Sequence, residues 1–228
     1  YSTMETAINN LRAAGVVCVA SAGNDGSACN TINGPPSHFA GSFTIGSTTS
    51  SDAMSSFSSR GNVNIDGSGR IKPNVSAPGS SVRSSIRGGN YATYSGTSMA
   101  GPHAVGAVAL LISAVPALAG QVDTIESILE RTAIHITSTQ TCNGTTPTTW
   151  PNNTVGHGRI DILAAVNYAQ TATWITPNAE ALHGFTVYPS PAKDELNAIL
   201  LNVKDQSAEV KIFAITGIPL LIIGILLG

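Results

Sequence analysis

The first part of the chain shows a helical hydrophobic pattern followed by a strand-like one. Over residues 5–14 the apolar positions recur at helical spacing, and Gly15 is a typical helix stop. Residues 16–20 are continuously apolar, as in a parallel strand that is covered on both faces. They lead into the polar, glycine-rich segment 21–26. A helix, a buried strand and a glycine-rich loop in this order predict a doubly wound α/β domain.

Downstream the same alternation continues up to about residue 170. Residues 43–47 are typical of a short strand, and residues 60–79 form a stretch rich in glycine, asparagine and proline. Residues 98–115 are apolar all round and rich in small side chains, which predicts a buried helix. Pro102 is tolerated in a first turn, so Ser98 is expected at the helix N-terminus. A further amphipathic helix is expected at 122–132, and residues 162–169 complete the main domain.

The pattern changes after residue 170 and divides the chain into three parts. We expect a main domain over residues 1–170, a linker over 171–184 and a small β module over 185–228. Residues 185–189 and 209–213 alternate as strands do, with a polar turn at 190–196. Residues 212–228 carry no charge, but Gly217, Pro219 and Gly224 argue against a membrane helix. We expect an incomplete β module there and no membrane anchoring.

Composition narrows the class of protein. The 228 residues have a net charge of −2 and only 11% charged side chains, less than half of what is usual in soluble domains. Serine and threonine supply most of the polarity, which fits a secreted or surface protein. No run of lysine and arginine is present to neutralise phosphates, and the pI is about 6.2. We therefore exclude a nucleic-acid partner.

The three cysteines show no metal-ligand spacing. Cys18 lies in the apolar run of the first strand and is expected to be a buried thiol. Cys29 and Cys142 lie in polar loops, where they can form a disulfide in an oxidising compartment. A free pair remains the alternative.

The strongest chemical feature is the segment 95–103, Ser-Gly-Thr-Ser-Met-Ala-Gly-Pro-His. It places Ser98 among small residues at the start of a helix, so that a substrate carbonyl can approach the hydroxyl. The unpaired N–H groups and positive end of the helix dipole would favour an oxyanion formed on attack. The alternative is an ordinary N-cap serine.

A second feature lies at the carboxyl end of the first strand, where α/β proteins commonly place ligand-contacting residues. Asn24 in the segment Ser-Ala-Gly-Asn-Asp-Gly can donate from its side-chain amide toward a developing oxyanion. Taken alone, the same segment is simply a turn.

Together the two segments resemble the subtilisin-like serine proteases, or subtilases, whose signature around the nucleophile is Gly-Thr-Ser-Met-Ala-x-Pro-His. Residues 96–103 match every fixed position. Four other segments resemble family signatures: Ala-Gly-Asn at 22–24, Phe-Ser-Ser-Arg-Gly at 57–61, Lys-Pro-Asn-Val-Ser-Ala-Pro-Gly at 72–79 and Gly-His-Gly-Arg-Ile-Asp at 156–161. The segment at 57–61 is a strand in the family. In the segment at 72–79, Asn74 replaces the usual Asp.

The resemblance implies an α/β fold of three layers with a mostly parallel sheet, incomplete at its N-terminus. It implies a serine endopeptidase that acts on protein or peptide substrates. Ser98 is then the nucleophile, and the Asn24 amide and the Ser98 backbone N–H form the oxyanion hole. Substrate-binding residues are implied beside them: Ser21, Ala22, Gly23, Asp25 and Thr97. Asp25 is expected to favour basic or polar side chains before the scissile bond. The resemblance also places a cis-proline turn at Pro35-Pro36.

One departure from the family matters for activity. The general base in a His-Gly-Thr/Ser context and the orienting aspartate in an Asp-Ser/Thr-Gly context precede the nucleophile in subtilases, and neither motif occurs in this sequence. His103 lies about 140° around the helix from Ser98, so it cannot bond the hydroxyl and is expected to be a core histidine. We expect this chain to be the carboxyl-terminal part of a subtilase and nearly inactive by itself.

The β module carries a second resemblance. Residues 185–196 and 210–217 resemble parts of the sorting domain that directs type IX secretion, although Ser190 replaces the usual Asn. This resemblance implies an extracellular or cell-surface protein of a bacterium, with secretion machinery as a partner. Subtilases often bind calcium through loops, but no carboxylate cluster of the D-x-D-x-D kind occurs here, and Asp66 is expected to be a turn residue.

Two other functions compete with the peptidase. An α/β-hydrolase esterase could use Ser98 with Asp123 or Asp161 and then His183, in the order Ser, Asp, His. A non-catalytic surface scaffold could retain a degenerate subtilase fold. The esterase leaves the Asn24 loop unexplained, and a scaffold needs neither Ser98 nor Asn24.

Overall fold

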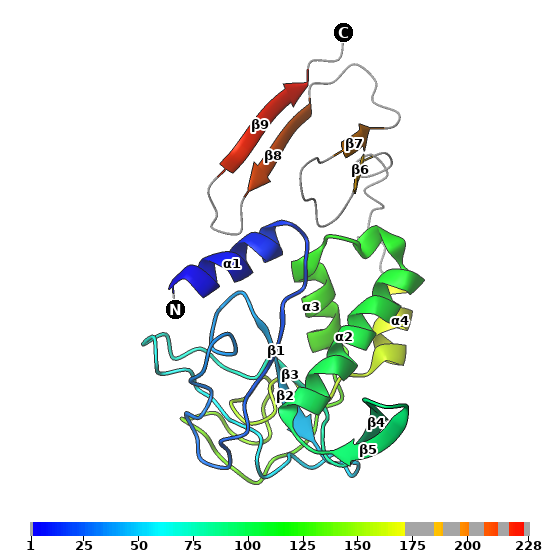
Figure 1. The fold of residues 1–228 in the computed structure, drawn as a ribbon. Helices are drawn as coiled ribbons and strands as arrows, with labels where there is room; N and C mark the ends of the chain where they lie inside the picture. The colour runs from blue at the N-terminus through cyan, green and yellow to red at the C-terminus, as the bar shows by residue number, and fades with distance from the viewer. Residues whose placement is uncertain (1, 172–184, 189–196, 201–207, 214–218, 226–228) are drawn as a thin grey trace. The chain divides into compact units, whose positions relative to one another are not determined.

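The computed structural model describes residues 2–171 in full and, beyond them, the backbone of four strands at 185–188, 197–200, 208–213 and 219–225. The chain divides into two compact units, Tyr1–Ala172 and Thr173–Gly228 (Figure 1). The residues predicted for the peptidase site all lie in the first.

A parallel sheet forms the centre of the first unit. Its strands are β1 (Val19–Ser21), β2 (Phe43–Thr48) and β3 (Val75–Pro78), in that order, and both pairings are parallel. Every residue of β2 is buried, as expected for a strand between two others. The mixed α/β architecture with a parallel sheet confirms the predicted fold class. The segment at 158–160 extends the sheet by pairing with Ser76 of β3.

The first helix and strand differ from the predicted ones in their bounds. Helix α1 (Ser2–Ala13) begins before residue 5 and has no buried residue. Gly15 follows it with a φ of 84°, so the predicted helix stop is confirmed. Strand β1 begins only at Val19, and Val16 is exposed, so the prediction of a strand covered over residues 16–20 was wrong for its first half.

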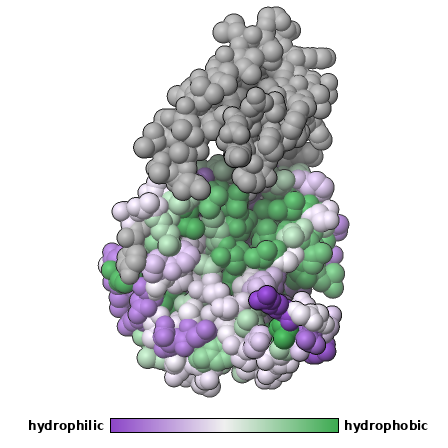
Figure 2. All heavy atoms as spheres, viewed as in Figure 1, coloured by the Kyte–Doolittle hydropathy of each residue, from purple (hydrophilic) through white to green (hydrophobic). Residues whose placement is uncertain are grey.

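Helix α2 (Thr97–Ala114) packs against all three strands and begins one residue before Ser98. Pro102 lies inside the helix and beyond its first turn. The predicted all-round burial was wrong, because the sheet covers only one side of the helix. Val105 and Leu110 on the other side are 53% and 58% exposed, and Figure 2 shows hydrophobic residues gathered in this region of the surface.

Two segments differ from what the sequence indicated. Strands β4 (Val82–Ile86) and β5 (Asn90–Tyr94) form an antiparallel hairpin that leads into α2, and the hydrophobic pattern had not indicated them. Residues 57–61 form a turn and an irregular segment, so the strand implied by the family resemblance is absent there.

The remaining helices of this unit are α3 (Val122–Arg131) and α4 (Ile162–Thr171), with a short 3-10 turn, η1 (Pro116–Leu118), before them. α3 packs against α4, and α4 packs against α2. The predicted helix at 122–132 is thus confirmed to within one residue, and residues 162–169, for which no element type was predicted, belong to α4.

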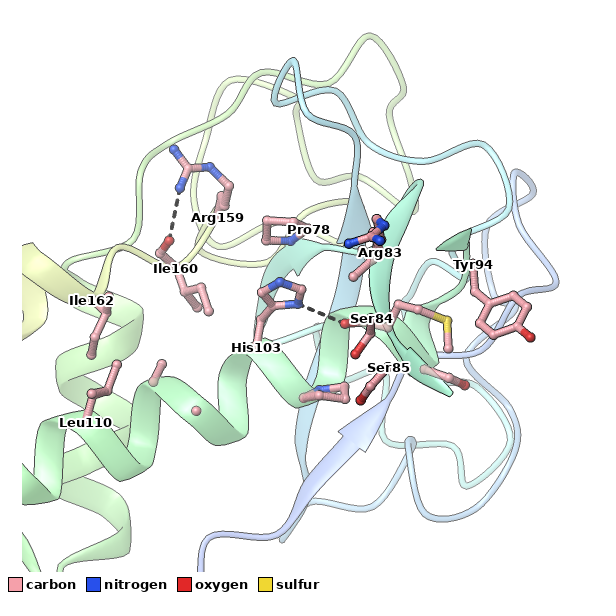
Figure 3. Close-up of a pocket in the computed structure, with 16 residues that line it drawn as sticks. Pro78, Arg83, Ser84, Ser85, Tyr94, His103, Leu110, Arg159, Ile160 and Ile162 are labelled. Atoms are coloured by element: carbon pink, nitrogen blue, oxygen red, sulfur yellow. Dashed lines mark hydrogen bonds between the residues drawn. The ribbon is translucent and has the colours of Figure 1, made fainter. Parts of the chain in front are cut away.

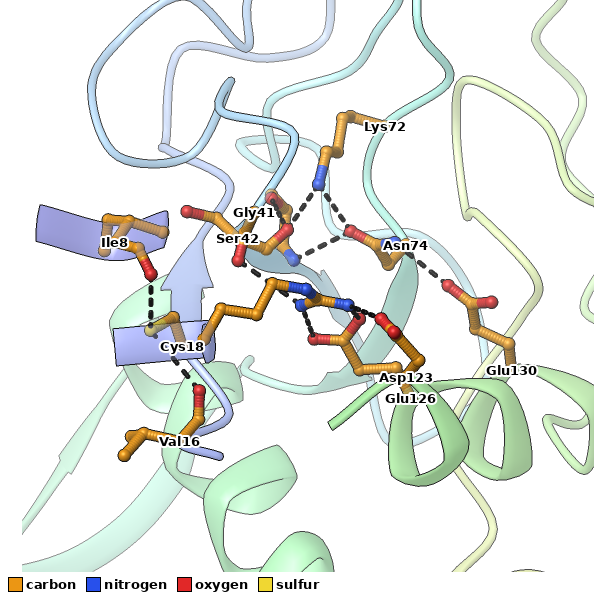
Figure 4. Close-up of polar contacts among 12 residues, drawn as sticks. Ile8, Val16, Cys18, Gly41, Ser42, Lys72, Asn74, Asp123, Glu126 and Glu130 are labelled. Atoms are coloured by element: carbon orange, nitrogen blue, oxygen red, sulfur yellow. Dashed lines mark hydrogen bonds and ion pairs between the residues drawn. The ribbon is translucent and has the colours of Figure 1, made fainter. Parts of the chain in front are cut away.

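A network of polar side chains joins α3 to the sheet and to α1 (Figure 4). Arg12 of α1 pairs with Glu126 of α3 at 2.6 Å. Lys72 is buried and donates to the Ser42 carbonyl at 2.5 Å and to Asn74 Oδ1 at 2.7 Å. The Asn74 amide nitrogen donates in turn to Glu130 of α3 at 2.9 Å. Burial lowers the pKa of Lys72 to about 8, because the desolvated ammonium has no carboxylate in direct contact.

All three cysteines have defined states. A disulfide joins Cys29 and Cys142 across 113 residues of sequence, which confirms that pairing. Cys18 is a buried free thiol, as predicted, and burial raises its pKa. The X-Pro bond at Pro35-Pro36 is cis, as the family resemblance implied.

The second unit contains two antiparallel strand pairs. Strand β6 (Phe185–Tyr188) pairs with β7 (Asn197–Leu200), and β8 (Ala208–Phe213) pairs with β9 (Pro219–Ile225). The two predicted strands correspond to β6 and β8. The uncharged tail contributes β9, a strand. The predicted turn at 190–196 and most of the predicted linker at 171–184 lie outside the described residues.

Candidate functional site

Ser98 is the second residue of α2 and is exposed. The N-cap position belongs to Gly96, which makes no side-chain capping bond, so the alternative of an N-cap serine was wrong. The Ser98 hydroxyl makes no hydrogen bond to any residue that the structure describes fully. Met99 N–H and Ala100 N–H donate to the Gly96 carbonyl at 3.0 and 3.3 Å, whereas the Ser98 N–H has no such acceptor. Ser98, the candidate nucleophile, therefore lies at a helix N-terminus, and both its hydroxyl and its N–H are available for hydrogen bonds.

The Asn24 loop lies beside this helix N-terminus. It follows β1, whose last residue, Ser21, donates from its hydroxyl to the Thr97 carbonyl at 3.1 Å. Asn24 Oδ1 accepts two hydrogen bonds from Thr97, one from the backbone N–H at 2.9 Å and one from the hydroxyl at 3.0 Å. Both bonds engage the oxygen of the amide. The nitrogen, Nδ2, is therefore turned away from Thr97 and stays available as a donor.

The two free donors face one space, and Gly96 keeps that space open. A Cβ atom built on Gly96 would lie 3.5 Å from Asn24 Nδ2 and 3.7 Å from Ser98 N. Met99 Sδ would lie 3.6 Å from the same point. An oxygen atom placed there could accept hydrogen bonds from both donors after a shift of a few tenths of an ångström. This arrangement suits the stabilisation of a negative charge that develops on a carbonyl oxygen.

The residues predicted to bind substrate surround the same point. Ala22 is buried at the end of the sheet, where its N–H donates to Ile45 O at 3.0 Å. Gly23 has a φ of 105° and donates to Thr97 Oγ1 at 3.2 Å. Asp25 is exposed, next to Asn24. The structure thus brings all of the predicted residues to one place: Ser21, Ala22, Gly23, Asn24, Asp25, Thr97 and Ser98.

A cavity of about 810 Å³ opens on the other side of Ser98 (Figure 3). The hairpin β4–β5 and the first turns of α2 line it, and no residue of the Asn24 loop takes part. Arg83 of β4 lies at the rim and stacks over the Tyr91 ring at 4.4 Å. Arg159, also in the lining, is paired with Asp52 at 2.5 Å. Ser98 therefore stands between the Asn24 loop and an open, largely apolar cavity.

Among residues 2–171, no histidine makes a hydrogen bond to the Ser98 hydroxyl. His103 shares the helix but bonds the Met99 carbonyl through Nδ1 at 2.9 Å, so the prediction that it cannot reach the hydroxyl holds (Figure 3). It is exposed, however, and the expectation of a core histidine was wrong. His157 lies 3.7 Å from Glu130, and burial lowers its pKa.

The residues proposed for an esterase triad are engaged elsewhere. Asp123 pairs with Arg12 at 2.5 Å, and Asp161 accepts the Ala164 N–H at 3.0 Å as the cap of α4. His183 lies outside the described residues. The esterase alternative therefore finds no support in the geometry.

The described part of the chain holds no group of three or more His, Cys, Asp or Glu side chains that could bind a metal ion. Asp66 accepts the Ser68 N–H at 3.0 Å and pairs with Arg70 at 2.5 Å, which is the turn role predicted for it. These residues therefore provide no carboxylate-rich site for calcium.

Two residues that shape this site were not singled out from the sequence. Gly96 leaves the space that both donors face, and Ser59 bonds the backbone on both sides of Asn24. Both belong to segments that the family resemblance had quoted, so the motif was the available signal. Their roles depend on contacts between distant segments, which periodicity does not show.

The chain is similar to several known proteins. The family model described as the subtilase family matches residues 1–158. Subtilisin E of Bacillus subtilis is 37% identical over 116 residues, which are 50% of this chain and 28% of that protein. Bacillopeptidase F of Bacillus subtilis is 38% identical over 169 residues, 70% of this chain and 11% of that protein. An extracellular protease of Xanthomonas campestris is 38% identical over 139 residues, 58% of this chain and 22% of that protein.

Among solved structures, the prenylagaramide maturation protease PagA has a similar fold. The TM-score is 0.56 at 24% identity, and the match covers 72% of this chain and 55% of that one. The chain thus spans about half of this structure and between 11% and 28% of the three curated relatives.

Proposed function

The chain belongs to the subtilase family, and from this premise we propose that it carries the nucleophile and the oxyanion hole of a serine endopeptidase. The observation that carries the proposal is the convergence of the Ser98 hydroxyl, the Ser98 N–H and Asn24 Nδ2 at the N-terminus of α2. In a surface scaffold, these three groups would not need to be free of hydrogen bonds. Protein or peptide chains are the proposed substrates.

The proposed reaction is acyl transfer through Ser98. Its Oγ attacks the carbonyl carbon of the scissile peptide bond, and the hydroxyl proton passes to a histidine base. The carbonyl oxygen becomes an oxyanion that accepts hydrogen bonds from Asn24 Nδ2 and Ser98 N–H. When the C–N bond breaks, the histidine returns the proton to the leaving amine, and an acyl-enzyme on Ser98 remains. Water then attacks the ester and releases the carboxylic acid.

The proposed base and its orienting aspartate lie outside these 228 residues. No histidine of residues 2–171 contacts Ser98, and the sequence contains neither family motif for these two groups. In subtilisin, loss of triad members lowers kcat by about 10⁴ to 10⁶. We therefore expect the isolated chain to hydrolyse peptides very slowly.

The coding region upstream of Tyr1 provides the first test. An Asp-Ser/Thr-Gly followed by a His-Gly-Thr/Ser in that region supports a complete triad. Their absence would leave Ser98 without a base and favour the scaffold.

The second test is covalent labelling. A fluorophosphonate probe should label Ser98 in the longer protease and should not label the Ser98→Ala variant. Ser95→Ala is the matched control, since Ser95 is also exposed but only accepts the Ser81 N–H at 2.8 Å.

We also propose that Asp25 affects the choice of the residue before the scissile bond. Its carboxylate is exposed beside the Ser21–Gly23 wall and forms no ion pair with any residue that the structure describes fully. Cleavage of a peptide library should show a preference for basic or polar side chains there, and Asp25→Ala should reduce it. A purely apolar preference in the parent protein would contradict this role.

Export of the protein is proposed on two grounds. The Cys29–Cys142 disulfide is stable in an oxidising compartment, and one relative is named an extracellular protease. The strands at 185–188 and 208–213 support a β module where the sequence resembles a type IX sorting domain. Deletion of residues 185–228 should keep the protein inside the cell envelope. Unchanged release into the medium would contradict the sorting role.

A further inference from the structure

The backbone of Asn24 lies in an exposed turn and still has to hold the amide in one place. Asn24 and Asp25 are exposed, and Gly23 has a φ of 105°, a conformation that glycine adopts readily. Thr97 fixes the side-chain oxygen of Asn24 but not the two peptide groups on either side of it. A donor that must meet an oxyanion needs its backbone fixed as well as its side chain.

Ser59 bonds both of these peptide groups. Its N–H donates to the Gly23 carbonyl at 2.9 Å, which belongs to the peptide group before Asn24. Its Oγ accepts the Asp25 N–H at 3.1 Å, which belongs to the peptide group after Asn24. We propose that Ser59 is a positioning residue that holds Asn24 through these two hydrogen bonds, the Ser59 clamp. This inference rests on the proposed function of Asn24.

The clamp is itself held rigidly. Ser59 is fully buried, and its Oγ would lie 2.9 Å from a Cβ atom built on Gly23, so the two segments are in close contact. On either side, Gly26 N–H donates to Phe57 O at 2.9 Å and Arg60 Nη1 donates to Ser27 O at 2.6 Å. Residues 57–60 therefore lie along residues 23–27, and Ser59 forms the contact nearest to Asn24.

Loss of the hydroxyl breaks one half of the clamp. In Ser59→Ala the backbone bond to Gly23 O remains, but Asp25 N–H loses its acceptor and the peptide group after Asn24 can rotate. The Thr97 bonds hold only the tip of the side chain, so Nδ2 would no longer keep one distance from the oxyanion position. Ground-state binding of a peptide depends less on this donor than the transition state does. The effect should therefore fall on kcat more than on KM.

The chain offers a matched control in the neighbouring residue. Ser58 is also fully buried, and its Oγ accepts the Ser47 N–H of β2 at 3.0 Å. Ser58→Ala removes a buried hydroxyl of the same size from the same segment, but its partner is a central strand and not the Asn24 loop. A general loss of packing would affect both variants alike.

The kinetic experiment uses the longer protease that contains this chain and its triad. We expect Ser59→Ala to lower kcat by about tenfold with a change in KM below about twofold, as for a misplaced catalytic donor. Ser58→Ala should leave kcat per titrated active site unchanged. In an Asn24→Ala background, Ser59→Ala should have little further effect, because a clamp without its donor has nothing to position. Equal losses of kcat in both backgrounds would overturn the proposal.

A second measurement separates the clamp from the proposed function. Amide hydrogen exchange at Asp25 should accelerate by at least about tenfold in Ser59→Ala and stay unchanged in Ser58→Ala. Unchanged exchange in Ser59→Ala would overturn the clamp whatever the kinetics show. Faster exchange together with an Asn24→Ala variant of full activity would overturn the oxyanion role of Asn24, and with it the part of Ser59 in the reaction.

Discussion

At the scale of single residues, Thr97 links the proposed nucleophile, Ser98, to the proposed oxyanion donor, Asn24. It precedes Ser98 on α2, and both its N–H and its hydroxyl donate to Asn24 Oδ1. The same hydroxyl accepts the Gly23 N–H at 3.2 Å. These bonds settle which end of the Asn24 amide faces the space beside Gly96. Without them the amide could turn its oxygen toward a developing negative charge.

We predict that Thr97→Val lowers kcat by about tenfold and stability by about 1 kcal/mol. The valine keeps the shape of the side chain and the backbone bond but removes the hydroxyl from two part-buried hydrogen bonds. Steady-state kinetics of the longer protease and urea unfolding measure the two effects. Thr93→Val in β5 is the control, because Thr93 is exposed and its hydroxyl makes no hydrogen bond to the Asn24 loop. An unchanged kcat in Thr97→Val would contradict the orienting role.

At the scale of elements, Asn74, just before β3, links α3 to a buried lysine. Lys72 precedes β3, and its ammonium contacts no carboxylate of the fully described residues directly. Asn74, where the family usually has Asp, accepts from Lys72 with its oxygen and donates to Glu130 with its nitrogen. The amide thus lies between a cation and an anion and satisfies both. The cost is a lysine whose pKa is lowered to about 8 by burial.

The lowered pKa predicts a rise in stability at alkaline pH. Between pH 8 and 10.5 the unfolded chain binds more protons at Lys72 than the folded chain, so the free energy of unfolding increases with pH in this window. The penalty is fully present below pH 8 and is lost above 10.5. We expect a gain of about 2 kcal/mol between pH 8 and 10 from this group. Urea unfolding at several pH values should show this gain in the wild type and not in Lys72→Met. The same dependence of the unfolding free energy on pH in both proteins would contradict the prediction.

Asn74 and Glu130 should be energetically coupled. Asn74→Asp gives Lys72 a counter-charge, but it also places a carboxylate where an amide now donates to Glu130 at 2.9 Å. We expect Asn74→Asp alone to raise the free energy of unfolding only slightly. The double variant Asn74→Asp, Glu130→Gln should be more stable than the sum of the two single effects predicts. A coupling of about 1 to 2 kcal/mol is expected from a double-mutant cycle. Additive effects would show that the two side chains act independently.

At the scale of the whole molecule, one disulfide ties the region behind the Asn24 loop to the loop around residue 142. Cys29 and Cys142 are 113 residues apart in sequence, so the closed loop includes β2, β3 and α2. Gln140, two residues before Cys142, also donates to the Ser27 carbonyl at 2.7 Å. The same two segments are therefore joined by a covalent bond and by polar contacts.

We predict that Cys29→Ser with Cys142→Ser lowers the free energy of unfolding by about 3 to 5 kcal/mol, because a long loop is no longer closed in the unfolded chain. Urea unfolding with and without reductant measures the loss. A thiol count on the denatured, unreduced protein should give one, from Cys18. Three thiols, or equal stability with and without reductant, would contradict the prediction.

Much of this molecule follows from local pattern. Helical spacing predicted α3 closely, and the segment 43–47 predicted β2, because each depends on contacts made by neighbouring turns or by one strand. The hairpin β4–β5 escaped prediction because its strands are almost wholly exposed and carry little hydrophobic alternation. The exposed side of α2 was not predicted, because the composition of a helix does not show how many of its faces the sheet will cover.

The sequence by itself determined the family, through a motif whose residues are adjacent in the chain, and with it the identity of Ser98 and Asn24 as candidates. Tertiary structure alone decided how they meet. The Thr97–Asn24 bonds span 73 residues, and the Ser59–Asp25 bond spans 34. Such contacts exist only after parallel strands and α2 have packed, because they join segments whose separation no periodicity records. The position of an amide nitrogen, which decides whether it can meet an oxyanion, is therefore a property of the fold.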